Sequence, residues 1–414
     1  MLRQARGQSA PRRSRAPRAP SRWLRACRRP RPSRRRQVRG PLSARARGRR
    51  AMSLNDSFDD RDTSVASQHT RDYGPPRLIV ELTNICNLHC SYCLRDEDAL
   101  YHTPANFFPV ELLRRVVREA RASIDASHVM FTGGETTLHP QFREIIETVG
   151  EERLKCSFVT NGWHFERIWP AVSANREAVT HVSFSLDGAT RESHDRWRGE
   201  GSFVRLVRAF SRCRAAGLPF VVKVGLRRDT LPHLEQIALF AARMGASSLS
   251  FGHLLPTSGA SDEELALGAD ERTESEQEIA VLAQILKMRV TIEVGYYNAD
   301  PAPPCSALAG VSCNIDYRGR LSLCCNLSGY RGASEEADVV ADLNEEAFAP
   351  AFERLRRLAE EQLARRRDAL AAQDVKSDIY LGSPCLFCLK SFGKVPWHAE
   401  AVSNARSLPV VQAV

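Results

Sequence analysis

The sequence predicts an α/β protein built around a partial, open (β/α)6 barrel, followed by a C-terminal cysteine-rich extension with a β-hairpin and a helix. Between residues 77 and 256, six short apolar runs alternate with amphipathic stretches. Regular alternation is typical of a parallel sheet with helices outside it. Six units are too few to close an eight-unit barrel, so an open barrel fits better. Six of the twelve cysteines follow residue 300, and they mark the extension.

The alternation assigns the elements in chain order. Strands are expected at 77–83, 127–133, 155–162, 180–188, 219–226 and 247–256, and helices at 109–123, 139–149, 164–174, 202–217 and 231–245. The first helix, for example, is predicted because Leu112, Val116 and Val117 fall on one face at helical spacing. Because parallel strands end at one edge of a sheet, functional groups are expected at the carboxyl ends of these strands.

The composition divides the chain into five parts. We expect a leader over 1–76, the barrel over 77–256, a polar linker with a helix and a strand over 257–302, the cysteine-rich domain over 303–395, and a tail over 396–414. Within the cysteine-rich domain, a hairpin is predicted at 314–323 and a charged helix at 347–374.

The formal charge of +10 comes from the leader. Residues 1–51 hold nineteen arginines and no acidic residue, whereas the other 363 residues carry 40 basic and 49 acidic side chains, a net of −9. An acidic body argues against a nucleic-acid binder. The Arg-, Pro- and Ser-rich leader cannot build a core and is predicted to be disordered. Residues 1–51 are interpreted as a basic arm, a transit peptide or, preferably, spurious translation upstream of Met52.

The sequence contains no run of 18 or more apolar residues and no apolar signal-peptide core. A transmembrane helix is therefore not expected. Twelve cysteines without a secretion signal indicate metal ligands or reduced thiols in the cytosol. We expect a cytoplasmic protein without nucleic-acid or membrane partners.

Three cysteines follow the first predicted strand in the segment CNLHCSYC, namely Cys86, Cys90 and Cys93. Zinc sites usually collect four ligands, and disulfide frameworks need an even number of cysteines in a short secreted chain. A [4Fe–4S] cluster is normally held by four thiolates, so three would leave one iron open to another ligand. His89, inside the loop, is the alternative fourth ligand.

Polar groups also follow the second strand and line the fourth. Gly133 and Gly134 let the backbone approach a ligand closely, and Glu135 offers an acceptor for an ammonium group, although an ordinary strand-to-helix turn would explain the triplet equally.

On the fourth strand, Ser183, Ser185 and Asp187 share the face opposite to the apolar residues. They indicate a polar ligand inside the barrel, or a strand end that faces solvent. Lys223, in the fifth strand, either meets a carboxylate or reaches water.

A C-x3-C-x2-C loop after the first strand, GGE after the second and S-x-D-G after the fourth together resemble the radical S-adenosylmethionine superfamily. The resemblance covers roughly residues 77–256 and departs at Thr136, where many relatives have proline. It implies an enzyme that reductively cleaves S-adenosylmethionine at a [4Fe–4S] cluster. The resulting 5′-deoxyadenosyl radical would abstract hydrogen from a substrate.

The resemblance also implies residue roles. Cys86, Cys90 and Cys93 would hold the cluster, and Tyr92 would lie beside the adenine. The methionyl ammonium would meet Gly133, Gly134 and Glu135, and the ribose or methionyl end would contact Ser185 and Asp187. Arg198 would reach the carboxylate or form a salt bridge within its loop.

The stretch C-x13-G-x4-C from Cys305 to Cys324 resembles the auxiliary-cluster domains named SPASM and twitch. Because no cysteine follows Cys388, a single auxiliary [4Fe–4S] cluster of the twitch-like kind is expected. Its implied ligands are Cys305, Cys313, Cys324 and one of Cys385 and Cys388. Zinc is the alternative metal. Cys325 is interpreted as a spare thiol, and Cys156 and Cys213 as buried core thiols.

The substrate is the least defined part of the prediction. The resemblance favours peptide or protein modification, with an electron donor such as flavodoxin or ferredoxin. The alternatives are a radical enzyme of cofactor or small-molecule biosynthesis, and a non-catalytic iron–sulfur or zinc protein.

Overall fold

The computed structural model describes residues 73–257, 265–293, 302–331, 336–374 and 378–395. All of them belong to the unit Ser53–Val414. The expected tail and all but the last four residues of the expected leader lie outside the described residues.

In the part of the chain that the structure describes, ten strands form one sheet in the order β10-β9-β8-β1-β2-β3-β4-β5-β6-β7. All pairs from β8 through β1 to β7 are parallel, and β8-β9 and β9-β10 are antiparallel. The strands are β1 Arg77–Glu81, β2 His128–Thr132, β3 Lys155–Thr160, β4 Val179–Ser185, β5 Phe220–Leu226, β6 Ser248–His253, β7 Arg289–Ile292, β8 Ser312–Ile315, β9 Arg320–Ser322 and β10 Val339–Asp342.

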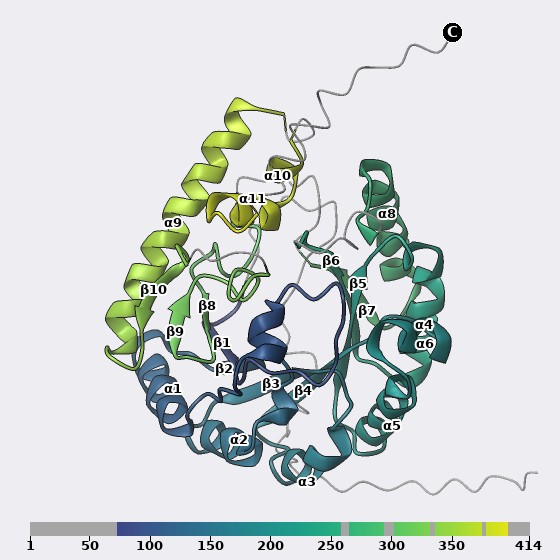
Figure 1. Cartoon of the computed structure of the whole chain (residues 1–414), viewed down its shortest axis with the longest axis horizontal. Helices are drawn as coiled ribbons and strands as arrows, with labels where there is room; N and C mark the ends of the chain where they lie inside the picture. Colours follow the sequence, from purple (N-terminus) through teal and green to yellow (C-terminus); the bar gives the residue numbers. More distant parts are fainter. Residues whose placement is uncertain (1–72, 258–264, 294–301, 332–335, 375–377, 396–414) are drawn as a thin grey trace, which may run out of the picture. The chain divides into compact units, whose positions relative to one another are not determined.

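Figure 1 shows the helices of the barrel around the outside of the sheet. They are α1 Val110–Ile124, α2 Phe142–Glu151, α3 Phe165–Ala174, α4 Arg191–Arg198, α5 Ser202–Ala215, α6 Leu234–Met244 and α8 Ala269–Ile285. The extension adds α9 Phe348–Ala372, α10 Ile379–Gly382 and α11 Pro384–Ser391. Within the described ranges, no helix is long and apolar enough to cross a membrane.

The outward face of the sheet carries apolar residues that pack against the surrounding helices. Phe184 of β4, for example, is fully buried and packs edge-on against Phe165 of α3 and Phe210 of α5. Burying one such side chain stabilises the fold by roughly 1.5–3 kcal/mol. Cys156 and Cys213 lie in the same core at 0% exposure, which confirms that they are core thiols.

The predicted fold class is confirmed, and the structure adds two features to it. Helix α4 lies where the sequence analysis placed a loop, and its start is stabilised by a capping box between Thr190 and Ser193. Strand β8 of the cysteine-rich extension pairs in parallel with β1, with Arg77 opposite Ser312. The extension therefore continues the sheet of the barrel, because its first strand takes the free edge of β1.

A second junction joins the extension to the cysteine loop. The backbone N–H of Asp96 donates to Gly329 O at 3.0 Å, and that of Arg331 donates to Leu94 O at 2.8 Å. Between them, the Arg95 guanidinium pairs with Glu81 at 2.8 Å and donates to Ser328 O. Glu81 is 2% exposed, and burial raises its pKa although Arg95 opposes the rise. One buried ion pair thus connects the end of β1, the cysteine loop and the extension.

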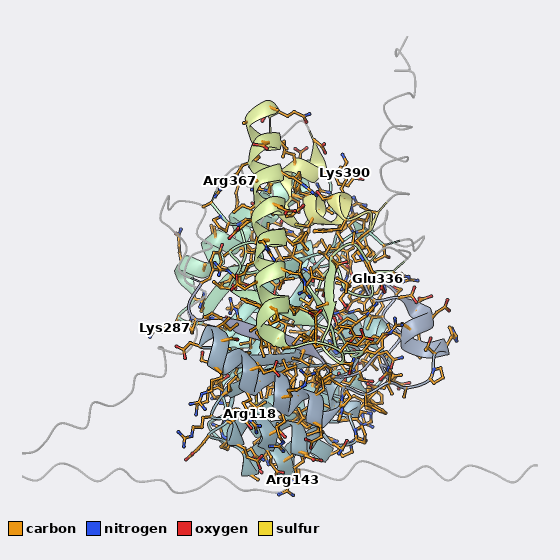
Figure 2. The ribbon with its side chains drawn as sticks, turned by 90° about the vertical axis from the view of Figure 1, so that its left-hand side faces the viewer. Arg118, Arg143, Lys287, Glu336, Arg367 and Lys390 are labelled. Atoms are coloured by element: carbon orange, nitrogen blue, oxygen red, sulfur yellow. The ribbon has the colours of Figure 1, made fainter. Side chains whose placement is uncertain are left out.

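We predict that Arg95→Met lowers the free energy of unfolding by about 3–5 kcal/mol, because it leaves Glu81 buried without its counter-charge. The matched control is Arg118→Met, which removes an exposed pair with Glu152 and should leave stability almost unchanged. Figure 2 shows Arg118 at the surface. Urea unfolding measures both variants, and equal losses would contradict the prediction.

Candidate active site

The cysteine loop follows β1 at the carboxyl edge of the sheet. Its three thiols, on Cys86, Cys90 and Cys93, are partly exposed and free of disulfides. Burial and, after it, the Glu135 carboxylate raise the pKa of the Cys86 thiol to about 12. Cys90 and Cys93 make smaller contributions in the same direction, so the thiols act on Cys86 electrostatically. The hydroxyl of Tyr101 donates to Leu88 O at 2.5 Å, and the Tyr101 ring stacks on His89 at 4.0 Å. The three predicted cysteines therefore lie together in one small loop.

The GGE turn after β2 packs directly against the entrance of this loop. The N–H of Gly134 donates to Thr83 O at 2.9 Å, and the N–H of Glu135 donates to Ile85 O at 2.8 Å. A Cβ on Gly134 would lie 2.0 Å from the Ile85 carbonyl oxygen, so no larger residue fits. Gly133 has φ +123°, in the region that favours glycine. Both glycines are thus required by the fold as well as available to a ligand.

The Glu135 carboxylate is 2% exposed and ties the turn to the end of β3. Its Oε1 accepts from Thr137 N, Thr137 Oγ1 and Thr160 Oγ1 at 3.1, 2.6 and 2.6 Å. Its Oε2 accepts from Asn161 N at 2.8 Å. A carboxylate oxygen has two lone pairs, so Oε2 has capacity for another donor. The carboxylate that the sequence assigned to an ammonium ligand therefore also holds the GGE turn against the end of β3.

Asp187 lies just after β4 and is 3% exposed. It accepts from Tyr92 Oη at 2.5 Å, from Arg227 Nη1 at 2.7 Å and from Arg198 Nε. Burial raises its pKa, but Arg198 and Arg227 outweigh this and hold the pKa below its usual range. Arg198 also donates to Tyr92 Oη at 3.0 Å. The structure thus brings together the predicted residues Tyr92, Asp187 and Arg198, and it gives Arg198 a salt bridge.

Sequence reasoning missed the centre of this network. Arg227, just after β5, is 0% exposed and lies between the rings of Tyr92 and Trp197, 4.6 Å from each centroid. Asp229 accepts from Arg227 Nε at 2.9 Å and from Trp197 Nε1 at 2.7 Å. The signal that could have found Arg227 is its position at the carboxyl end of a strand, the rule that identified Asp187.

The inward face of the barrel is polar, as the fourth strand predicted. Ser183 is 3% exposed, and Ser185 pairs in register with Lys223 of β5. Lys223 forms an ion pair with Glu293, at the end of β7, at 2.5 Å, and both side chains are partly exposed. Ser250 of β6 donates to the same carboxylate at 3.3 Å. Of the two interpretations of Lys223, the structure supports contact with a carboxylate.

Four cysteines of the extension line a common pocket. Cys305 and Cys324 come from the segments around the hairpin, and Cys385 and Cys388 come from α11. Apolar residues complete the lining, among them Leu308, Leu323, Leu327 and Leu389. Burial raises the pKa of the Cys305, Cys385 and Cys388 thiols, and the charge of Cys305 adds to the rise at Cys385 and Cys388. Four thiols are the number of donors that a tetrathiolate metal site uses, but in this structure they are not drawn together closely enough to hold a metal ion.

Cys313 differs from the expectation, because it does not line this pocket. It lies in β8 at 0% exposure, paired in register with Leu78, and belongs to the hydrophobic core. Cys325 is absent from the pocket lining, but it lies close enough to act on the thiols of Cys305, Cys324 and Cys385. A hydrogen bond from Cys324 lowers the pKa of Cys325. In the part of the chain that the structure describes, no three His, Cys, Asp or Glu side chains are grouped so as to hold a metal ion.

Comparisons with known proteins give a family for this arrangement. The family model described as "Radical SAM superfamily" matches residues 80–241, within the barrel. Mycofactocin maturase MftC from Mycobacterium tuberculosis is 30% identical over 266 residues, which are 60% of this chain and 64% of that protein. MftC from Mycobacterium ulcerans is 31% identical over 268 residues, 60% of this chain and 68% of that protein.

AdoMet-dependent heme synthase from Oleidesulfovibrio alaskensis is 31% identical over 219 residues, 50% of this chain and 53% of that protein. The chain thus spans slightly less than two thirds of the M. tuberculosis relative and about half of the heme synthase. Among solved structures, Streptococcus suis SuiB bound to precursor peptide SuiA matches with TM-score 0.53 at 13% identity, over 68% of this chain and 66% of that chain.

We predict that Gly134→Ala displaces the cysteine loop, because the added Cβ would overlap the Ile85 carbonyl. Loss of the two backbone hydrogen bonds of the turn, each worth roughly 1 kcal/mol, should speed amide exchange at residues 134 and 135 about thirtyfold. The control is Gly225→Ala, where the nearest atom is 3.9 Å away. Hydrogen exchange read by mass spectrometry measures both, and unchanged protection in Gly134→Ala would refute the steric argument.

Proposed function

Since the chain belongs to the radical SAM superfamily, we propose that it cleaves S-adenosylmethionine reductively at a [4Fe–4S] cluster and uses the resulting radical to abstract hydrogen from a substrate. The observation that carries this proposal is the loop with Cys86, Cys90 and Cys93, held against the GGE turn. Three thiols in one partly exposed loop fit a cluster that keeps one iron open.

When bound, the cluster and S-adenosylmethionine supply one-electron reduction of the sulfonium and a carbon-centred radical. The chain's own residues bind and orient that pair. Oε2 of Glu135 has capacity for the methionyl ammonium, beside the backbone of Gly133 and Gly134. Tyr92 would lie beside the adenine, where Asp187 and Arg227 fix its ring.

Ser185 and Asp187 would face the ribose or methionyl end of the ligand from β4. The Asp187 carboxylate is held in one orientation by two guanidinium groups and the Tyr92 hydroxyl. Asp187 can therefore present its backbone and its remaining lone pairs to the ligand without rearranging. Arg198, which pairs with Asp187, would present its guanidinium to the ligand carboxylate. Such preorganisation favours reaction because the entropy cost of ordering these side chains is met when the protein folds, not when the ligand binds.

We propose that Cys305, Cys324, Cys385 and Cys388 hold an auxiliary [4Fe–4S] cluster. These four thiols line one apolar pocket, whereas Cys313 lies apart in the core. This set differs from the one that the resemblance to auxiliary-cluster domains implies, in which Cys313 is a ligand. Zinc remains the alternative metal, because four thiolates bind either.

For the substrate, we propose a peptide or protein. The support is the similarity to MftC, whose name describes a maturase, and the shared fold with SuiB, which was solved with its precursor peptide. A radical enzyme of cofactor or small-molecule biosynthesis is the second candidate, since a heme synthase is equally identical over a shorter span. A flavodoxin or ferredoxin would supply the electron.

The test of the radical chemistry is anaerobic incubation of reconstituted protein with S-adenosylmethionine and dithionite. We expect 5′-deoxyadenosine and about eight irons per chain, since each of the two clusters holds four. Changing Cys86, Cys90 and Cys93 together to Ala should abolish 5′-deoxyadenosine and leave about four irons. Continued turnover in the triple variant would refute the assignment of the loop.

The ligand set of the extension makes a separate prediction. Cys324→Ala should lose the four irons of the auxiliary cluster, whereas Cys313→Ala should keep about eight irons, because Cys313 lies outside the pocket. Iron and zinc analysis of both variants decides the matter. Equal iron loss in the two variants would restore Cys313 as a ligand, and one stoichiometric zinc in place of four irons would make the extension a zinc fold.

A further inference from the structure

Two glycines lie side by side on the inward face of the barrel, near the carboxyl ends of β5 and β6. Gly225 and Gly252 are paired in register, and two residues earlier on the same strands Lys223 pairs with Ser250. These residues alternate with buried apolar residues, so they share one face of the sheet. In Figure 1, β5, β6 and β7 lie inside the arc of α4, α6 and α8. The two glycines, here called the glycine patch, thus expose bare backbone beside the pair of Lys223 and Glu293.

The fold itself does not require glycine at either position of the patch. Neither residue has a φ in the left-handed region, which is the backbone conformation that favours glycine. A Cβ on Gly225 would lie 3.9 Å from its nearest neighbour, Arg227 Nη1. A Cβ on Gly252 would lie 3.3 Å from Glu293 Oε2, the end of a flexible side chain. Glycine inside a strand is less stable than alanine, and it often marks the close approach of a ligand.

Glu293 holds a carboxylate against the glycine patch. Its backbone N–H donates to Phe251 O at 2.8 Å, which fixes it beside the end of β6. Its Oε1 accepts from Lys223 Nζ at 2.5 Å and from Ser250 Oγ at 3.3 Å. Its Oε2 is the atom that lies over Gly252. A carboxylate oxygen has two lone pairs, so Oε2 can accept from a donor that lies on the patch.

The pair of Lys223 and Glu293 is open to a ligand and lies next to the proposed site of S-adenosylmethionine. The two side chains are 34% and 46% exposed. Exposed pairs contribute little to stability, so the fold gains little from holding this one on the inward face. Lys223 also pairs in register with Ser185, which the proposed function places at the ribose or methionyl end of the ligand. Adjacent strands are about 4.8 Å apart, so a substrate on the glycine patch would lie close to that ligand.

We propose that the glycine patch and Glu293 form a subsite for the backbone of a peptide substrate. The peptide lies across Gly225 and Gly252, and one of its backbone amide N–H groups donates to Glu293 Oε2. Because Lys223 already compensates the carboxylate, a neutral amide donor suits this site better than a second cation. The inference rests on the proposed function, and it names the atoms of this chain that hold the proposed peptide.

The first test of this subsite uses the full, reconstituted chain with S-adenosylmethionine and a pool of short random peptides whose ends are acetylated and amidated. Mass spectrometry identifies the peptides retained on ultrafiltration. Gly225→Ala and Gly252→Ala should each weaken retention of the parent's peptides roughly tenfold, because the added methyl group occupies the place of the peptide backbone. Both variants should unfold at or above the parent's temperature, since alanine is the more stable strand residue. A purely structural role of the glycines would lower that temperature.

The second test addresses the hydrogen bond to Glu293. The backbone amides of a retained peptide are methylated one at a time, which removes their N–H groups. One methylation should weaken binding to the parent roughly tenfold and have little further effect on Glu293→Ala, which lacks the acceptor. The matched control is Glu166→Ala, which removes a similarly exposed pair with Arg212 on the outer helices and should behave as the parent.

Each outcome decides the proposal. Parent-like retention by either glycine variant overturns it, as does a methylation series in which no amide depends on Glu293. A parent that forms 5′-deoxyadenosine but retains no peptide overturns this inference and leaves the proposed radical chemistry standing. A parent that forms no 5′-deoxyadenosine overturns the proposed function, and this inference with it.

Discussion

The buried ion pair between Arg95 and Glu81 is the contact on which the arrangement of both cysteine groups depends. Glu81 is the last residue of β1, Arg95 follows the last cysteine of the cysteine loop, and the Ser328 carbonyl that accepts from Arg95 belongs to the extension. Removing either partner of a buried ion pair leaves an uncompensated charge. The pair therefore fixes the positions of these three segments relative to one another. The pairing of β8 with β1 also fixes the position of the extension relative to the barrel. The two cysteine groups are therefore parts of one folded unit, not separate modules joined by a linker.

Much of the barrel was predictable because its signals are local. Apolar alternation placed all six barrel strands. The rule that parallel strands end at one edge was enough to predict that the cysteine loop, Glu135 and Asp187 gather at the same edge of the sheet. Gly134 was noticed from its residue type, but its partner, the Ile85 carbonyl in the loop after β1, is a distant segment that the structure reveals.

The remaining features depend on contacts between distant segments. Spacing could not reveal that Cys313 points into the core, because a strand shows which residues share a face but not which face is covered. Arg227 reads as one of two adjacent arginines, and only tertiary packing places it between Tyr92 and Trp197. Gln362 and Arg366 lie in a helix that the sequence predicts as charged, and only tertiary packing shows that these two polar side chains are buried.

The first cysteine group is accompanied by an arginine that is 0% exposed, Arg227, whose guanidinium lies over the Tyr92 ring of the cysteine loop. A buried guanidinium is unfavourable by several kcal/mol unless negative charge lies near it. For Arg227 that charge is Asp187, which also orients Tyr92 of the cysteine loop. The fold therefore accepts this buried cation because Asp187 compensates its charge, and the same contacts fix the Tyr92 ring on the cysteine loop before any ligand binds.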